Sequence, residues 1–371
     1  MIAGGGIAGS SLFRYMAEAG MNPVLVNADR GSSWRNIGGG RTAFSLPELA
    51  EIAAQNHHIF KELQYLSNID YKPIRYISFA HDEETYKALE ASKAWSKAEM
   101  IAPKQFREEI SPYFNANPKK YISALVSEDC WQATPGKVVD LVRNLGIAAG
   151  GTVMEDCRVL EACREGKYTS VLVQTHDKKY VEYRTEHFVN ALGSGAGKLC
   201  DSMGIDAGLY PVRHQAFIPR RLPMLGKHGT NLDMLIDRQD YKGFSAVYGQ
   251  QIAYTGQIIG CASPKLDAMR IDKNLKVNTK AFLEIVSEMF SEWIPDLAGV
   301  GIQAVWAGYY TEPRYIVDPE LGLFVGMRGH GFMLSQYIAR MYVDKLLGRP
   351  VPEYFEKLKL NGPGLSEKAF K

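Results

Sequence analysis

The N-terminal segment alternates between apolar runs of strand type and of helix type. Met1–Ala3 is a short apolar run, a glycine-rich turn follows it, and residues 8–19 place apolar side chains at helical spacing. Gly20 stands where a helix-ending glycine is common. The next run, Pro23–Val26, is continuously apolar, as in a parallel strand that is buried on both faces. The pattern therefore predicts one strand–helix–strand unit.

Helix and strand patterns continue along the rest of the chain. Amphipathic helices are expected over residues 47–66, 83–98 and 136–149, and strands over 152–160, 170–175, 180–183 and 187–191. Residues 210–305 are rich in strand patterns, Tyr and Gln, and residues 322–347 predict a strand, a glycine turn and a long helix.

This order of elements predicts an α/β (α+β) fold in two parts. We expect a Rossmann-like nucleotide-binding domain that carries an inserted antiparallel-sheet substrate domain, because the chain leaves and re-enters the nucleotide-binding pattern. The expected nucleotide-binding domain comprises residues 1–75, 130–210 and 305–371, and the substrate domain comprises residues 76–129 and 211–304.

Composition excludes several classes of function. The 43 Lys and Arg residues nearly balance the 41 Asp and Glu residues, so charge gives no reason to expect a nucleic-acid partner. The five cysteines form no CxxC pair, which argues against a zinc site and favours reduced thiols in a cytoplasmic protein. No metal site is expected. The apolar runs fall short of the roughly 18 residues that a membrane span needs, so no transmembrane segment is expected.

Gly4-x-Gly6-x-x-Gly9 lies between the first strand and the first helix, as dinucleotide-binding glycine loops do. The glycines allow a tight turn, a close approach of the backbone to a pyrophosphate, and close packing of helix on strand. Ile7 and Ala8 open the helix, whose unpaired N–H groups attract phosphate. The ribose acceptor is expected at Asn27, the last position of the second strand, or at Asp29, and this alternative stays open.

Further segments resemble one family. Ser33-Trp-Arg-Asn-Ile-Gly-Gly-Gly-Arg41 resembles the S-x-R-N-x-G-G segment of the D-amino-acid oxidase-like flavoenzymes, the family of glycine oxidase and sarcosine oxidase. Phe188–Leu199 resembles their V-N-A-x-G-x-W turn, and Gly329-His-Gly-Phe-Met333 resembles their C-terminal G-H-G motif. Together with Trp306-Ala-Gly308, the resemblance extends from the N-terminus to about residue 350.

The resemblance implies a non-covalent FAD, because no cysteine lies at residues 305–318, where sarcosine oxidases attach the flavin. It implies that Gly38–Gly40 pass the isoalloxazine, that the chain near Val159 binds adenine, and that the helix after Gly329 stabilises reduced flavin. The cofactor-binding residues that we expect are Gly4, Gly6, Ile7, Ala8, Gly9, Asn27, Asp29, Ser33, Arg35, Asn36, Gly38, Gly39, Gly40, Arg41, Val159, Ala191, Gly193, Arg328, Gly329, His330, Gly331, Phe332 and Met333.

The chain departs from the family where relatives bind a substrate carboxylate. Met333 stands in place of a lysine, and Tyr310 in place of an arginine. We therefore expect a pocket that is less positive and more apolar, and a substrate with at most one carboxylate, such as a hydrophobic amine or N-alkyl amino acid. The candidate catalytic residues are Arg41, Tyr248, Tyr310, Arg314 and His330. Tyr254 is a further aromatic candidate, although strand tyrosines are often structural, and Arg314 is equally consistent with a surface ion pair.

The activity implied is oxidation of an amine or amino acid at its C–N bond, with hydride transfer to flavin N5. The alternative is a flavin-holding, non-catalytic or electron-passing subunit of a larger amine dehydrogenase, because such a subunit would lack the cationic residues that are missing here. The electron acceptor is left open.

Overall fold

The first strands and helix of the chain form the predicted nucleotide-binding unit. The computed structural model describes residues 1–111, 114, 120–226, 232–238, 244–252, 255–264 and 279–367. β1 (Ile2–Ala3) and β2 (Val24–Asn27) are parallel neighbours joined by α1 (Ile7–Glu18). The remaining strands of this sheet are β7 (Thr152–Glu155), β11 (Val189–Asn190), β17 (Ile316–Asp318) and β18 (Leu323–Val325), in the order β17-β18-β11-β1-β2-β7. The Rossmann-like sheet is confirmed.

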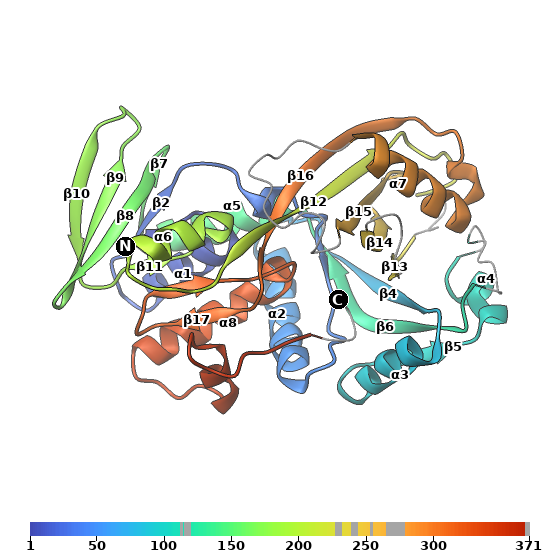
Figure 1. Ribbon diagram of the computed structural model, residues 1–371, viewed down its shortest axis with the longest axis horizontal. Coiled ribbons are helices and arrows are strands. Elements are labelled where there is room, and N and C mark those ends of the chain that lie inside the picture. The colour runs from blue at the N-terminus through green and yellow to red at the C-terminus, as the bar shows by residue number, and fades with distance from the viewer. Residues whose placement is uncertain are drawn as a thin grey trace.

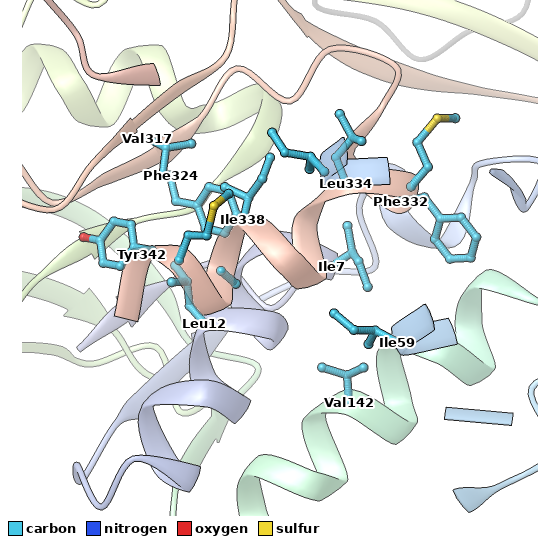
Figure 2. Packing of buried hydrophobic residues seen from close by; sticks show 14 of the residues in the cluster. Ile7, Leu12, Ile59, Val142, Val317, Phe324, Phe332, Leu334, Ile338 and Tyr342 are labelled. Carbon is cyan, nitrogen blue, oxygen red and sulfur yellow. The ribbon is translucent and has the colours of Figure 1, made fainter. Parts of the chain in front are cut away.

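Helices cover this sheet and form the main core with it. α2 (Pro47–Leu66), α5 (Pro135–Ala148) and α8 (Gly331–Leu346) pack with α1. Figure 2 shows α8 among side chains of these helices and of β17 and β18, including Leu12, Val142 and Phe324. Leu12, Val142 and Phe324 are fully buried, and each such side chain contributes roughly 1.5–3 kcal/mol relative to exposure. This core fixes the start of α8 beside the glycine loop.

One predicted strand is divided in two. Residues 152–160 were expected to form a single strand, but the chain turns at Asp156, whose φ of 53° lies in the left-handed region. Before the turn, β7 pairs with β2; after it, β8 (Arg158–Glu165) joins a small antiparallel sheet with β9 (Tyr168–Gln174) and β10 (Tyr180–Thr185). This small sheet lies at one end of the molecule (Figure 1).

The larger sheet forms the other half of the molecule (Figure 1). Its strands are β3 (Gly39–Gly40), β4 (Lys72–Ala80), β5 (Ala98–Ile101), β6 (Ser123–Gln132), β12 (Tyr210–Pro219), β13 (Met234–Asp237), β14 (Phe244–Gln251), β15 (Ile258–Pro264) and β16 (Ile302–Glu312). The order is β16-β12-β15-β14-β13-β4-β6-β3, with β5 on β6. Its described pairs are antiparallel except β13 with β4, which are parallel.

The predicted domain borders fall inside continuous strands. β4 crosses the expected border at residue 75, β6 crosses the one at residue 129, and β16 crosses the one at residue 304. The two-domain division stays a prediction, because these strands belong to one sheet from end to end. In Figure 1 the long strands β12 and β16 extend from the nucleotide-binding half into the larger sheet.

One helix prediction and one strand-rich prediction in the substrate region need correction. The helix expected over residues 83–98 ends at Ala91, as α3 (Glu83–Ala91), because Ser92 begins a 3-10 turn and residues 98–101 pair with β6 as strand β5. The strand-rich region 210–305 contains α7 (Thr279–Trp293), which the strand pattern around it concealed. The short helices α4 (Phe106–Glu109) and α6 (Ala196–Ser202) complete the α-helices of the described chain. Within the described residues, none of the helices is both long and apolar enough to cross a membrane.

Candidate active site

A cavity of about 1010 Å³ lies where the nucleotide-binding sheet meets the larger sheet. Its walls come from the glycine loop, the ends of β2 and β11, the loop before β3, the strands β12 to β16, and the start of α8. All of the predicted site residues line this cavity except Gly9, Gly40 and Arg314. Tyr254 lies outside the described residues. The sequence motifs therefore converge on one space.

The glycine loop has the geometry of a phosphate cradle. A Cβ atom at Gly9 would lie 1.8 Å from the carbonyl oxygen of Gly4, so Gly9 serves backbone packing rather than the cavity. A Cβ at Gly6 would meet only the Ser33 hydroxyl, at 2.9 Å, and would extend into the cavity that Gly6 lines. The Ser33 Oγ accepts a hydrogen bond of 2.8 Å from the N–H of Ile7, at the start of α1. Close backbone approach and a helix N-terminus together fit a dinucleotide pyrophosphate.

Both ribose candidates line the cavity, and the alternative between them stays open. Asn27 is the buried last residue of β2, and its Nδ2 donates to Glu155 at 2.8 Å, which leaves its amide oxygen beside Gly5. Asp29 is exposed and forms an ion pair of 2.8 Å with Arg158. Val159, expected near adenine, lies on β8 in the same wall.

The glycines beside the predicted flavin position are explained by protein packing. A Cβ at Gly39 would lie 2.2 Å from the Tyr76 hydroxyl, and a Cβ at Gly40 would lie 2.2 Å from the ring of Trp131. A side chain at Gly39 or Gly40 would therefore collide with a residue of the larger sheet. Gly38 has a φ of 80°, in the region that favours glycine. Its N–H donates a hydrogen bond of 2.7 Å to Oδ1 of Asn36.

Arg41 is buried and held in place by its own loop. Its Nε donates to the carbonyl oxygen of Ala43 at 2.9 Å, and its guanidinium lies 4.3 Å from the centre of the Phe44 ring. One terminal nitrogen also lies 3.5 Å from Nε2 of His330. The other ring nitrogen, Nδ1, forms a hydrogen bond with the Tyr315 hydroxyl. His330 therefore links Arg41 with Tyr315.

The opposite wall is a group of neutral polar rings on the larger sheet. The hydroxyls of Tyr248 and Tyr310 are 2.9 Å apart, and the ring of His214 stacks on Tyr310 with centroids 3.6 Å apart. Burial lowers the pKa of His214 to about 3, so its imidazole is neutral. Burial, chiefly, raises the pKa of both tyrosines above the ordinary range. Gly329 permits this contact with α8, since a Cβ there would lie 2.4 Å from the Tyr310 ring.

Two further arginines have different positions. Arg328 lines the cavity at a φ of 52°, and its Nε donates to the buried carboxylate of Glu312 at 2.7 Å. The predicted substrate-binding role of Arg314 is not supported, because Arg314 lies outside the cavity lining. Its guanidinium instead donates to the carbonyl oxygens of Leu360 and Gly362, which fastens the C-terminal segment.

The structure also adds residues that the sequence interpretation did not place. Arg238, directly after β13, lines the cavity and adds a cation that the sequence analysis did not place there. Burial, with a smaller contribution from the charge of Arg41, lowers its pKa to about 10. Strand alternation could have indicated Arg238, since Met234 and Ile236 line the same wall. Met333 lines the cavity, as expected of a site residue, and its side chain is buried.

The chemistry of the lining agrees with a non-covalent cofactor. The described residues that line the cavity include no cysteine, and the described part of the chain holds no cluster of three His, Cys, Asp or Glu side chains able to bind a metal ion. The glycine cradle, the helix start and the guanidinium Nη1 of Arg328, which has no hydrogen-bond partner among the described residues, fit a large anionic cofactor.

Solved structures share this fold over nearly their whole length. The chain is similar to L-proline dehydrogenase from P. horikoshii, with 22% identity, a TM-score of 0.80, and coverage of 97% of this chain and 96% of that one. It is also similar to glycine oxidase from Bacillus cereus, with 19% identity, a TM-score of 0.76, and coverage of 96% and 97%. Glycine oxidase from Geobacillus kaustophilus gives 17% identity, a TM-score of 0.78, and coverage of 97% of both chains.

Among curated protein sequences, none matches this chain. A family model described as FAD dependent oxidoreductase matches residues 1–345. FAD is therefore the cofactor, and the chain is an enzyme that belongs to the DAO family of FAD-dependent oxidoreductases.

Proposed function

We propose that this enzyme oxidises the C–N bond of an amine or amino acid that carries at most one carboxylate. The observation that carries the proposal is the shared cavity: the glycine cradle for FAD and the buried Arg41 open into the same space. The solved structures of similar fold include a proline dehydrogenase and glycine oxidases, whose substrates are amino acids.

Arg41 is the group best suited to bind the substrate carboxylate. Its Nε is fixed on Ala43 and its plane lies on Phe44, so little conformational entropy remains to be lost on binding. A guanidinium binds a carboxylate through two parallel hydrogen bonds, which orients the substrate as well as holding it. The link through His330 to Tyr315 fixes Arg41 from its other side.

Neutral groups surround the position left for the amine. When bound, FAD supplies the hydride acceptor, and only a neutral amine can release hydride readily. His214 is uncharged because burial lowers its pKa to about 3, and Tyr248 and Tyr310 keep their protons. These rings can hydrogen-bond an amine without adding charge, and a low-dielectric cavity disfavours the ammonium form. Val212, Met234 and Ile236 supply an apolar wall, which favours a hydrophobic substrate.

The test is an anaerobic screen for flavin bleaching with primary amino acids, N-alkyl amino acids, cyclic amino acids and amines. We expect at least one compound to reduce the flavin. Arg41→Gln should raise the half-saturating concentration of that amino acid about tenfold, since a charged hydrogen bond contributes about 1.5–3 kcal/mol. The variant should not affect a neutral amine in this way. Arg184→Gln, on the outer strand β10, is the control.

Two results would count against the proposal. If a chemical reductant bleaches the flavin but no amine does, the protein is better explained as a flavin-holding or electron-passing subunit. If Arg41→Gln loses FAD while its substrate dependence is unchanged, Arg41 serves the cofactor.

A further inference from the structure

A second cavity, of about 530 Å³, shares none of its described lining residues with the first. It lies between α2 and the strands β4 and β6, and Figure 1 shows α2 beside these strands. The described residues that line it are His57, Lys61, Tyr71, Pro73, Ile74, Arg75, Glu128, Asp129, Cys130 and Asp233. A space of this size can hold a small molecule.

A bulge in β6 shapes one wall of the second cavity. The regular pairing of β4 with β6 is interrupted there, so that Glu128 and Asp129 lie opposite the single residue Arg75. Asp129 has a φ of 55°, which is unfavourable for a residue other than glycine. All three residues line the cavity. Bulges that redirect side chains are common beside functional sites, so the bulge is a reason to look for a ligand here.

Arg75 holds this wall in one position. Its backbone N–H and its Nε donate to the two carboxylate oxygens of Asp233, at 2.9 Å each. Its Nη2 donates to the carbonyl oxygen of Glu109 at 2.5 Å. Arg75 therefore joins β4 to the chain before β13 and to the end of α4, and the cavity keeps its shape without a ligand.

Two neutral rings form the floor of the second cavity. Nε2 of His57 and the Tyr71 hydroxyl are hydrogen-bonded at 2.7 Å, and the ring centroids lie 6.0 Å apart with 29° between the planes. Burial lowers the pKa of His57 to about 4, so its imidazole is neutral. A planar ligand can stack on such rings. Lys61, which also lines the cavity, can donate a hydrogen bond to an oxygen of that ligand.

Trp131 connects this floor with the wall of the first cavity. His57 stacks on the Trp131 ring with centroids 4.6 Å apart and only 6° between the planes. The same ring lies against Gly40, where an added Cβ would approach it to 2.2 Å. The neighbours of Gly40 in the chain, Gly39 and Arg41, line the first cavity. The Trp131 ring and the β3 backbone therefore form a direct path between the second cavity and the predicted isoalloxazine position.

We propose that the second cavity binds a quinone, which accepts the electrons of the reduced flavin across Trp131 and His57. Electrons, unlike a hydride ion, can cross packed side chains to an acceptor that does not touch the flavin. Two electrons and two protons leave the reduced flavin, which returns to FAD, and the quinone takes up two electrons and two protons to become a hydroquinone. Water carries the protons. The quinone ring stacks on Tyr71, and one carbonyl oxygen accepts a hydrogen bond from Lys61. This second substrate is independent of which amine is oxidised.

The experiment uses the FAD-loaded protein and a water-soluble benzoquinone. The flavin is reduced by light without an amine, and its reoxidation is followed by visible absorbance in the absence of oxygen. We expect the rate to saturate as the quinone concentration rises. Lys61→Gln should raise the half-saturating concentration about tenfold, the order expected for the loss of one charged hydrogen bond. Tyr71→Leu should raise it about fivefold, because it removes the stacking ring. Lys93→Gln, an exposed lysine outside both cavities, is the control and should change nothing.

Calorimetry measures the same site without any reaction. The benzoquinone is titrated into the oxidised, FAD-loaded protein, and we expect Lys61→Gln to weaken its binding about tenfold and Lys93→Gln to leave it unchanged. If the quinone does not bind the oxidised protein, the proposal is wrong. It is also wrong if Lys61→Gln and Tyr71→Leu are reoxidised with the half-saturating concentration of the wild type, because the quinone then reaches the flavin through the first cavity.

The outcome is separable from that of the amine screen. If Lys61→Gln responds as expected but no amine bleaches the flavin, the quinone site stands and the proposed amine oxidation fails. If an amine bleaches the flavin but Lys61→Gln changes neither binding nor reoxidation, the amine oxidation stands and the quinone site is refuted.

Discussion

Gly6 and Gly9 are both small for different reasons: we expect Gly6 to leave room for FAD, whereas Gly9 leaves room for the protein backbone. At Gly9 an added Cβ lies 1.8 Å from the carbonyl oxygen of Gly4, whereas ordinary contact begins near 3.4 Å, so the loop must shift by about 1.6 Å. That loop is fixed by the bond from Gly4 N–H to Val26 and by the Ser10 hydroxyl on Gly5. Overpacking against backbone costs roughly 3 kcal/mol, and the gain in helix propensity returns about 1 kcal/mol. Gly9→Ala should therefore destabilise even the FAD-free protein by about 2 kcal/mol.

At Gly6 the same methyl group meets only the Ser33 side chain, whose hydroxyl lies at 2.9 Å and needs to shift by a few tenths of an ångström while it still accepts the Ile7 N–H. The backbone of Gly6, with a φ of −69°, is open to any residue. Gly6→Ala should therefore leave the melting temperature of the FAD-free protein within about 2 °C of wild type, while Gly9→Ala lowers it by about 4 °C. For Gly6→Ala the loss appears in FAD affinity, by about 100-fold or roughly 2.7 kcal/mol, because the methyl group takes the space of the approaching pyrophosphate.

The assay is thermal unfolding of both FAD-stripped variants, followed by FAD titration monitored by flavin fluorescence. The reasoning is refuted if Gly6→Ala melts as early as Gly9→Ala without FAD, or if Gly6→Ala binds FAD as tightly as wild type. Either result would mean that the cavity beside Gly6 is not where the pyrophosphate lies.

Three further outcomes are expected. Glu312→Gln leaves the buried Arg328 charge uncompensated and should cost about 3 kcal/mol in urea unfolding, whereas Glu83→Gln, in an exposed pair, should cost almost nothing. Because the pKa of His214 is lowered to about 3, the unfolded chain takes up this proton first as pH falls, so stability declines below about pH 6.5. His214→Phe should reduce that slope by up to about 1.4 kcal/mol per pH unit between pH 6 and 4, with His57 contributing part of what remains; an unchanged slope would contradict this. Acid precipitation should release FAD into the supernatant, and yellow colour retained in the pellet would show a covalent bond.

Local features of the sequence predicted the nucleotide-binding unit well. The glycine loop, the first helix and the helix over residues 47–66 depend on spacing and turn chemistry that neighbouring residues determine. The resemblance motif also led to Arg41, which lines the cavity.

Residues brought in by tertiary contacts were not predictable in the same way. Arg238 reaches the cavity because β13 pairs with β4, from a distant part of the chain. Arg314, for which the sequence left a catalytic role and a surface ion pair open, donates instead to carbonyl oxygens of the C-terminal segment, a contact between distant parts of the fold. Gly40 was expected beside the isoalloxazine, and the structure shows that an added Cβ there would also meet the ring of Trp131.

The strands that run uninterrupted across the predicted domain borders bear on how this enzyme can change over evolution. β4, β6 and β16 each contribute to both sides of a border, so the larger sheet cannot be exchanged, duplicated or lost as a module without breaking hydrogen-bonded strands. New substrate preferences must then arise by replacing single side chains on the cavity face of existing strands. On β13, for example, Met234 and Ile236 line the cavity, whereas Leu235 between them belongs to the core.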